Sequence, residues 1–166
     1  LGNVLIDFDH RIAAQRLSQF TDKVEQEIVN LFFDSHLTAI FEEGRISPPD
    51  FFSKVKEALN LKLEYVEFLP IWNEIFSLSE KNQAVYKITK TLKYRYKLAL
   101  LSNVNILHFE YVKKGYPILD AFHHIITSFE VGLRKPHPLI YQKALKLLGV
   151  EPEKAFYTDD RPELIE

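Results

Sequence analysis

Hydrophobic residues follow two alternating patterns along this 166-residue chain. Short apolar runs end abruptly at polar residues, and they lie at residues 3–6, 98–101, 125–127 and 155–157. Such runs are typical of strands that are buried on both faces of a parallel sheet. Between them, apolar residues recur at the three- and four-residue spacing of amphipathic helices. This alternation predicts an α/β fold around a parallel sheet.

The part of the chain between residues 12 and 78 carries helical patterns and no good strand pattern. Residues 12–41 predict two helices or one bent helix. Ser47 precedes two prolines and an aspartate, which is the composition of a helix start. Residues 65–76 predict another helix, which Pro70 either kinks or starts. We expect these helices to form a small helical lobe.

Further helices are predicted after this lobe. Ser79 begins one of them, and residues 138–149 form another, which ends at a glycine, the residue that most often takes the left-handed conformation after a helix. We therefore expect two units. Residues 1–11 and 79–166 would form an α/β core, and residues 12–78 would form a helical cap inserted after the first strand.

Composition and charge narrow the function classes. Hydrophobic residues make up 46% and charged residues 27% of the chain, as in ordinary soluble globular proteins. The net charge of -2 comes without a basic stripe, which argues against nucleic acid or an anionic membrane as a partner. No apolar run reaches membrane-spanning length, and the lack of cysteine fits a reducing compartment, so we expect a cytoplasmic protein. Because methionine is absent too, we expect residues before Leu1.

Polar residues follow the predicted strands at the end where an α/β sheet binds ligands. Ser102-Asn103 follows one strand, Asp159-Asp160 follows another, and Lys135 lies shortly before the last strand. Two adjacent carboxylates repel each other, so a divalent cation is a natural partner for them; the alternative is that they cap a helix expected from Pro162. Hydroxyl, ammonium and metal-binding carboxylate groups together suit phosphate chemistry, because cations offset phosphoryl charge and donors hold its oxygens.

Four segments form an ordered set of motifs along the chain: Leu1–Asp9, Leu100–Asn103, Val131–Pro136 and Phe156–Arg161. The set resembles the motifs of the haloacid dehalogenase (HAD) superfamily. Segments around Gly44 and Trp72 resemble the helical cap of a subgroup that includes bacterial α-D-glucose-1-phosphate phosphatase. The resemblance implies a Rossmann-like parallel sheet core with an inserted α-helical cap domain. It also implies phosphate ester hydrolysis through an aspartyl-phosphate intermediate, with Mg²⁺ beside the nucleophile.

The resemblance further implies a role for each matching residue. Ser102 would hold a phosphate oxygen, helped by the backbone of Asn103. Lys135 would neutralise the nucleophile and the phosphoryl oxygens. The metal ligands would be, directly or through water, Asp159 and Asp160, together with the carbonyl of Gly2.

The catalytic aspartate of the first motif would immediately precede Leu1, so we expect it outside this sequence. Gly2 occupies the position of the usual general acid, and Leu164 that of an Asp or Asn in the last motif; both departures leave open a catalytically impaired protein. A competing alignment takes Asp7–Asp9 as the nucleophile and its acidic partner, but Arg11 then stands where threonine or valine is needed.

These patterns favour a Mg²⁺-dependent phosphohydrolase that acts on a small phosphorylated metabolite, such as a sugar phosphate. One alternative is a catalytically impaired HAD-fold protein that binds a ligand or a protein. The other is a haloacid dehalogenase, whose chemistry has no use for a metal pair. We expect a monomer or a weak homodimer whose partner is a small phosphorylated substrate.

Overall fold

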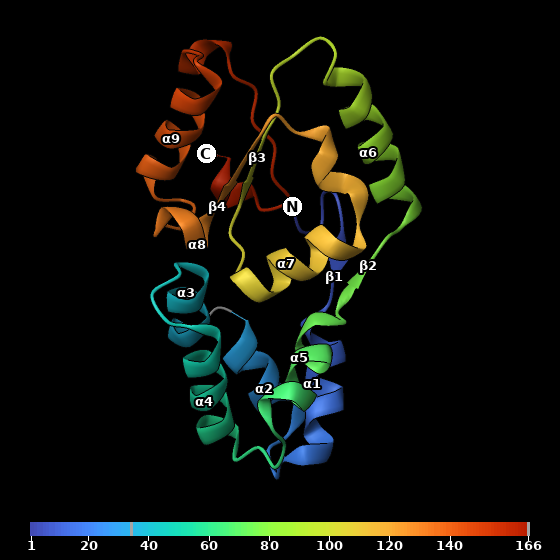
Figure 1. The fold of residues 1–166 in the computed structure, drawn as a ribbon, viewed down its shortest axis with the longest axis vertical. Coiled ribbons are helices and arrows are strands. Elements are labelled where there is room, and N and C mark those ends of the chain that lie inside the picture. The colour runs from blue at the N-terminus through green and yellow to red at the C-terminus, as the bar shows by residue number, and fades with distance from the viewer. Residues whose placement is uncertain (34, 166) are drawn as a thin grey trace.

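The computed structural model describes residues 1–33 and 35–165, and helices predominate in it (Figure 1). The α-helices are α1 (His10–Leu17), α2 (Glu25–Phe32), α3 (His36–Glu42), α4 (Pro48–Leu59), α5 (Tyr65–Asn73), α6 (Glu80–Leu92), α7 (Ile106–Gly115), α8 (Ser128–Val131) and α9 (Pro138–Leu148). The strands are β1 (Asp7–Phe8), β2 (Phe76–Ser77), β3 (Ala99–Ser102) and β4 (His124–Thr127). Short 3₁₀ helices are η1 (Ser18–Phe20), η2 (Pro117–Ala121), η3 (Pro152–Lys154) and η4 (Pro162–Leu164). Glu166, the last residue of the predicted core, lies outside the described residues.

Two groups of elements are separate in the ribbon view (Figure 1). Helices α1 to α5 form the lower group, which we call the helical lobe, and β3, β4 and α6 to α9 form the upper group, which we call the α/β lobe. The predicted boundaries after residues 11 and 78 stay predictions.

Capping residues begin and end the helices where the sequence predicts. Ser47 Oγ accepts a hydrogen bond from the backbone N–H of Asp50, and Ser79 Oγ accepts one from Asn82, which confirms both helix starts. Helix α9 ends at Gly149 in the left-handed conformation, with φ 63°.

The first helical stretch is divided more finely than predicted. Residues 12–41 belong to three α-helices instead of two, because Ser35 begins a new helix by accepting a hydrogen bond from the backbone N–H of Thr38. The helix predicted over residues 65–76 ends at Asn73, and Pro70 lies inside it.

The helical lobe is held together by an aromatic core. Trp72 is fully buried, with Phe32 edge-on to its indole at a centroid distance of 4.7 Å and Phe68 stacked at 5.6 Å. Phe41 and Phe51 stack at 4.1 Å beside it. Aromatic pairs of this kind add about 0.5–1.5 kcal/mol each to the hydrophobic burial, so the high phenylalanine content serves packing first.

The α/β lobe is built around β3 and β4, which are parallel as predicted. Ala99 is aligned with His124 and Ser102 with Thr127, so the two strands end at the same level. Leu101 and Ile126 pack with Ile140 of α9 on one side, while Leu100 packs with α7 and η2 residues on the other. Both faces are therefore apolar, which explains the uninterrupted hydrophobic runs.

The chain passes between the two lobes as a short antiparallel ribbon. Asp7 is aligned with Ser77, and Phe8 with Phe76. The strand predicted at residues 3–6 is wrong, because Leu5 N–H donates to the Leu1 carbonyl and closes a turn with Asn3 at φ 54°. The expectation of no strand between residues 12 and 78 is wrong too because of β2, since a two-residue strand leaves no pattern in a sequence.

The last predicted elements also differ from the structure. Residues 155–157 pair with no described strand, and Phe156 is 92% exposed. An apolar run indicates the capacity for burial, but a strand needs a neighbouring edge for its backbone groups. The helix expected from Pro162 is only the three-residue η4. Among the described residues, no helix is both long and apolar enough to cross a membrane.

One buried and one partly buried histidine, His108 and His10, lie where the lobes meet. His108 Nε2 lies 3.0 Å from the carbonyl oxygen of Trp72, and its Nδ1 lies 3.0 Å from Asn105 Nδ2. These partners place the proton on Nε2 and leave Nδ1 as the acceptor. Burial lowers the pKa of His108 to about 3 and the pKa of His10 to about 4.

We predict that the protein loses stability as the pH falls below about 6.5. The unfolded chain takes up protons on both histidines near that pH, whereas the folded chain does so only near pH 3 to 4. The unfolded state therefore binds more protons in between, and the free energy of unfolding falls by up to about 1.4 kcal/mol per pH unit for each histidine. Urea unfolding measured between about pH 6.5 and 5, above the carboxyl range, tests this prediction.

The variant His108→Gln is expected to be less stable than the wild type. Its free energy of unfolding should also fall less steeply with decreasing pH, because only His10 then contributes. His36→Gln, at an exposed position, is the matched control and should keep the wild-type slope. A wild-type slope in His108→Gln would contradict the assignment.

Candidate active site

The loop after β3 is tied to the loop after β4. Ser102 is buried, and its hydroxyl donates to the carbonyl of Asn103 at 3.3 Å. Val104 N–H donates to Ser128 Oγ at 3.0 Å, and the same hydroxyl donates back to the Val104 carbonyl at 3.2 Å. The ends of the two parallel strands thus hold one another in place.

Asn103 clamps the backbone of Lys135. Its side-chain oxygen accepts from Lys135 N–H at 2.7 Å, and its amide nitrogen donates to the Lys135 carbonyl at 3.0 Å. One asparagine therefore satisfies both backbone groups of a residue in a loop that has no regular partner. The residue that follows β3 therefore fixes the backbone from which the Lys135 side chain extends.

The ammonium group of Lys135 forms a buried ion pair with Asp159. Lys135 Nζ lies 2.5 Å from Asp159 Oδ2, and the two side chains are only 6% and 7% exposed. Tyr157 completes the group, because its hydroxyl donates to the same oxygen at 2.5 Å and lies 3.2 Å from the ammonium nitrogen. Three polar groups share one small volume with little access to water.

The electrostatics of this group favour a charged pair. Burial alone would raise the pKa of Asp159, but hydrogen bonds from Lys135 and Tyr157, together with the lysine charge, lower it to about 2. Burial, and then the hydrogen bond to Asp159, raise the pKa of the Tyr157 phenol above its usual range. Asp159 is therefore ionised and Tyr157 remains a neutral donor at neutral pH.

Asp160 lies beside this pair on the exposed side. Its Oδ2 accepts a hydrogen bond from Asn3 Nδ2 at 3.0 Å. Asn3 belongs to the turn that follows Gly2, and a Cβ added to Gly2 would lie 2.4 Å from the Phe8 ring. The N-terminal turn and the C-terminal acidic pair are thus adjacent, although they come from opposite ends of the chain.

The structure brings together most of the residues predicted for the site. Asn103, Lys135 and Asp159 are joined by direct hydrogen bonds, and Asp160 is joined to the turn at Gly2 through Asn3. The buried hydroxyl of Ser102 faces the carbonyl of its own neighbour. The roles of these residues remain predictions.

Sequence reasoning missed two members of this group, Tyr157 and Asn3. The pattern at residues 155–157 predicts an apolar strand that includes Tyr157, and only the position of Tyr157 two residues before Asp159 points to a role for its hydroxyl. The pattern at residues 3–6 predicts a strand that includes Asn3, whereas the left-handed backbone of Asn3 turns its amide to Asp160. Asparagine tolerates that conformation better than most residues.

Asp159 makes a local bond of the kind expected for a helix cap. Its Oδ1 accepts from the backbone N–H of Arg161 at 3.1 Å, while its Oδ2 accepts from the Lys135 ammonium group. Only the three-residue η4 follows Asp159, so the local bond closes a turn and begins no long helix. Binding of a divalent cation by the acidic pair stays a prediction.

The residues predicted to hold the cation, Asp159, Asp160 and the Gly2 carbonyl, would all offer oxygen atoms. Mg²⁺ takes oxygen ligands and keeps several waters, so few protein ligands suffice. Within residues 1–33 and 35–165, no group of three or more His, Cys, Asp and Glu side chains could hold a metal ion. A cation beside Asp160 would therefore rely on carboxylate oxygens, the Gly2 carbonyl, water and the oxygens of a bound phosphate.

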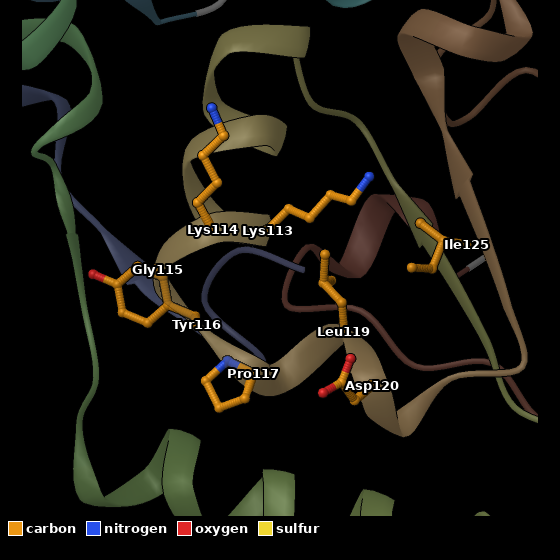
Figure 2. A pocket seen from close by; sticks show the side chains of 8 residues that line it. All are labelled: Lys113, Lys114, Gly115, Tyr116, Pro117, Leu119, Asp120 and Ile125. Atoms are coloured by element: carbon orange, nitrogen blue, oxygen red, sulfur yellow. The ribbon is translucent and has the colours of Figure 1, made fainter.

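A separate surface hollow of about 430 Å³ lies between the C-terminal end of α7 and η2. Figure 2 shows its lining, with Lys113, Lys114, Tyr116 and Asp120 around it. None of the residues predicted for the phosphate site lines this hollow. It is a different place from the site described above.

The chain belongs to the haloacid dehalogenase-like hydrolases, because that family matches residues 8–165. Its fold is that of a HAD family enzyme from Bacteroides thetaiotaomicron, solved in complex with magnesium and inorganic phosphate. The two structures superpose with a TM-score of 0.83 at 24% identity, over 98% of this chain and 83% of the other.

Two curated relatives have sugar-phosphate names. The chain is 23% identical to a D-ribitol-5-phosphate phosphatase of Bacteroides thetaiotaomicron, over 96% of this chain and 79% of that protein. It is 48% identical to a glyceraldehyde 3-phosphate phosphatase of Methanopyrus kandleri, but over 40 residues, which span 17% of that relative. Neither name is α-D-glucose-1-phosphate phosphatase, so the subgroup expected from the sequence stays a prediction, whereas the superfamily is confirmed.

We predict that Asn103→Ala destabilises the fold by about 1–3 kcal/mol, because it leaves both backbone groups of Lys135 without their protein partners. Asn30→Ala is the control, since Asn30 is exposed on α2 and accepts only a helix-surface bond from Gln26. It should change stability by less than about 0.5 kcal/mol. Equal midpoints of urea unfolding for the two variants would show that the clamp has no energetic role.

Proposed function

We propose that this protein is a Mg²⁺-dependent phosphatase that hydrolyses a small phosphorylated metabolite, such as a sugar phosphate. The observation that carries the proposal is the buried Lys135–Asp159 pair, fixed by Asn103 and lying beside Asp160. A buried ammonium group that is held in place and faces carboxylates suits the binding of a phosphoryl group, whose oxygens need positive charge. Family membership and the sugar-phosphate names of the relatives support the same chemistry.

The nucleophile in this proposal is an aspartate immediately before Leu1. The backbone nitrogen of Leu1 is buried within reach of the charges on Lys135, Asp159 and Asp160. A residue joined to that nitrogen would lie among the same three groups. Its carboxylate oxygen would attack phosphorus as the ester P–O bond breaks, and water would then attack the aspartyl phosphate and release inorganic phosphate.

Each residue of the site then has one task. Lys135 would neutralise the attacking carboxylate and the phosphoryl oxygens, and Tyr157 would hold Asp159 in place. Ser102 would turn its hydroxyl from the Asn103 carbonyl to a phosphate oxygen. Asp160 and the Gly2 carbonyl would hold Mg²⁺, with Asp159 contributing directly or through water. When bound, Mg²⁺ supplies positive charge that stabilises the transferring phosphoryl group.

Gly2 limits the general acid catalysis available to this site. A Cβ at this position would come within 2.4 Å of Phe8, so an aspartate does not fit beside the ring as it is packed. The proton for the leaving oxygen would come from water or from the substrate, at a cost of up to about 10²–10⁴ in rate. The same observation is the one that favours the second candidate, a HAD-fold protein of low activity that binds a phosphorylated ligand.

The helical lobe would act as the cap that selects the substrate. The ribbon β1–β2 connects it to the α/β lobe, in which the proposed site lies. Ribitol 5-phosphate, glyceraldehyde 3-phosphate and α-D-glucose 1-phosphate are the compounds to assay first. A monomer suffices for this site, since every residue named for it comes from one chain.

The residue encoded before Leu1 is the first test. We expect aspartate, and any other residue would exclude the covalent mechanism. The full-length protein is then expected to hydrolyse p-nitrophenyl phosphate or one of the three sugar phosphates with added Mg²⁺ and to stop after treatment with a chelator. Turnover that survives removal of the metal would overturn the metal assignment. Chloride release from a 2-haloacid without phosphate release would favour the dehalogenase alternative.

We predict that Asp160→Asn lowers kcat/KM by at least about 10²-fold, the kinetic equivalent of several kcal/mol, because it removes a charged metal ligand. Its stability should change little, because Asp160 is exposed. Asp22→Asn, in the turn before α2, makes the same chemical change far from the site and should retain full activity. An Asp160→Asn enzyme as active as this control would be incompatible with the proposed site.

A further inference from the structure

Besides the buried contact between His108 of α7 and Trp72 of α5, the helical lobe and the α/β lobe touch at two further places. On one side the ribbon of β1 and β2 connects them, and on the other side the end of α3 faces α8 and the loop after it (Figure 1). The first contact is made by the two chain crossings. The second contact is made only by side chains and close-packed backbone, so it can form and break without a change in chain direction.

The second contact contains an ion pair between the lobes. Arg134 Nε lies 2.8 Å from Glu42 Oε2, and the two side chains are 22% and 19% exposed. Glu42 ends α3 in the helical lobe, whereas Arg134 precedes Lys135 in the α/β lobe. Partial burial reduces the screening of this pair by water and salt, so it binds more firmly than an open surface pair.

Gly44 brings the two lobes into close contact at the same place. It has φ 67°, a conformation that side chains disfavour, and an added Cβ would lie 2.3 Å from the carbonyl oxygen of Phe129 in α8. The backbone of the helical lobe therefore lies directly against the backbone of the other lobe. We call Glu42, Gly44, Phe129 and Arg134 the clasp.

The clasp adjoins the residue on which the proposed chemistry depends. Arg134 is covalently next to Lys135, whose own backbone is held only from the α/β lobe, through Asn103. The loop is thus anchored at two points, one in each lobe. When the clasp is closed, the position of Lys135 therefore depends on the position of the helical lobe.

We propose that Glu42 is a positioning residue: through its ion pair with Arg134 it couples closure of the helical lobe to the placement of Lys135. This inference rests on the proposed function for its effect on turnover, but its structural part does not. Opening of the clasp frees the loop at residue 134, exposes the Lys135 ammonium group to water and moves it relative to Asp159. Closure restores the buried pair that a phosphoryl group needs.

The test compares Glu42→Gln with Glu43→Gln in the full-length protein. Both changes remove one charge at neighbouring positions, but Glu43 pairs with Arg45 of its own lobe at 3.3 Å. Lysine labelling with an acetylating reagent, followed by mass spectrometry, measures how often Lys135 becomes accessible. Exposed Lys143 on α9 is the internal reference for reagent and time.

We expect Glu42→Gln to label Lys135 about threefold faster or more, as loss of a partly buried ion pair allows, with Lys143 unchanged. The same variant is expected to lose about tenfold in kcat, because a displaced charge no longer meets the transferring group. KM and the thermal midpoint should change little. Glu43→Gln should match the wild type in every measurement.

A second comparison separates coupling from general loosening. Arg134→Gln should reproduce the labelling and the kcat of Glu42→Gln, and the double variant should be no worse than either single one, because one interaction is lost only once. Fully additive losses, or an unchanged Lys135 labelling rate in Glu42→Gln, would overturn the proposal. Faster labelling with unchanged kcat would overturn the positioning role.

The proposed function and the clasp can fail separately. If no phosphate ester is hydrolysed by the wild type while Glu42→Gln still labels Lys135 faster, the phosphatase assignment is wrong and the clasp is real. If the wild type is an active phosphatase and the two glutamate variants behave alike, the clasp has no role and the phosphatase assignment stands.

Discussion

The buried ion pair between Lys135 and Asp159 is the constraint on which the candidate site depends. Two charges that are almost wholly removed from water are tolerated only when each has its partner, because loss of either partner leaves an uncompensated buried charge. Asn103 supplies the backbone anchor and Tyr157 the additional hydrogen bond. Together these contacts connect the loop after β3, the loop before α9 and the segment after η3.

The helical lobe is stabilised in a different way and is attached to that unit at its margins. Its core is aromatic and apolar, and its polar contacts with the α/β lobe are few and specific. His108 reaches the Trp72 carbonyl from α7, while Glu42 reaches Arg134 from α3. The His108 contact is a buried hydrogen bond between neutral groups, whereas the Glu42 contact is a partly exposed ion pair. Such an arrangement suits a lobe that stays folded while its contact with the site changes.

Local signals in the sequence were sufficient for the starts of α4 and α6, for the end of α9 and for the two parallel strands β3 and β4. The helix caps act through hydrogen bonds within a few residues, as at Ser47, Ser79 and Gly149. Such local bonds can be predicted from the sequence without knowledge of the fold. The failures at residues 3–6 and 155–157 have the opposite cause. An apolar run has the right composition for a strand, but only a neighbour elsewhere in the chain can supply its ladder of hydrogen bonds.

The sequence by itself determined the family resemblance, the order of the motifs and the residue types at the strand ends, because these are properties of single segments. Only the tertiary structure decided which of them meet. It joined Asn103, Lys135 and Asp159 at hydrogen-bond distance and added Tyr157 and Asn3, which lie within motif segments but had no predicted role. It also brought Glu42 from the helical lobe to the loop of Lys135. The physical reason is that burial and pairing of charges depend on distances across the fold, which spacing along the chain does not contain.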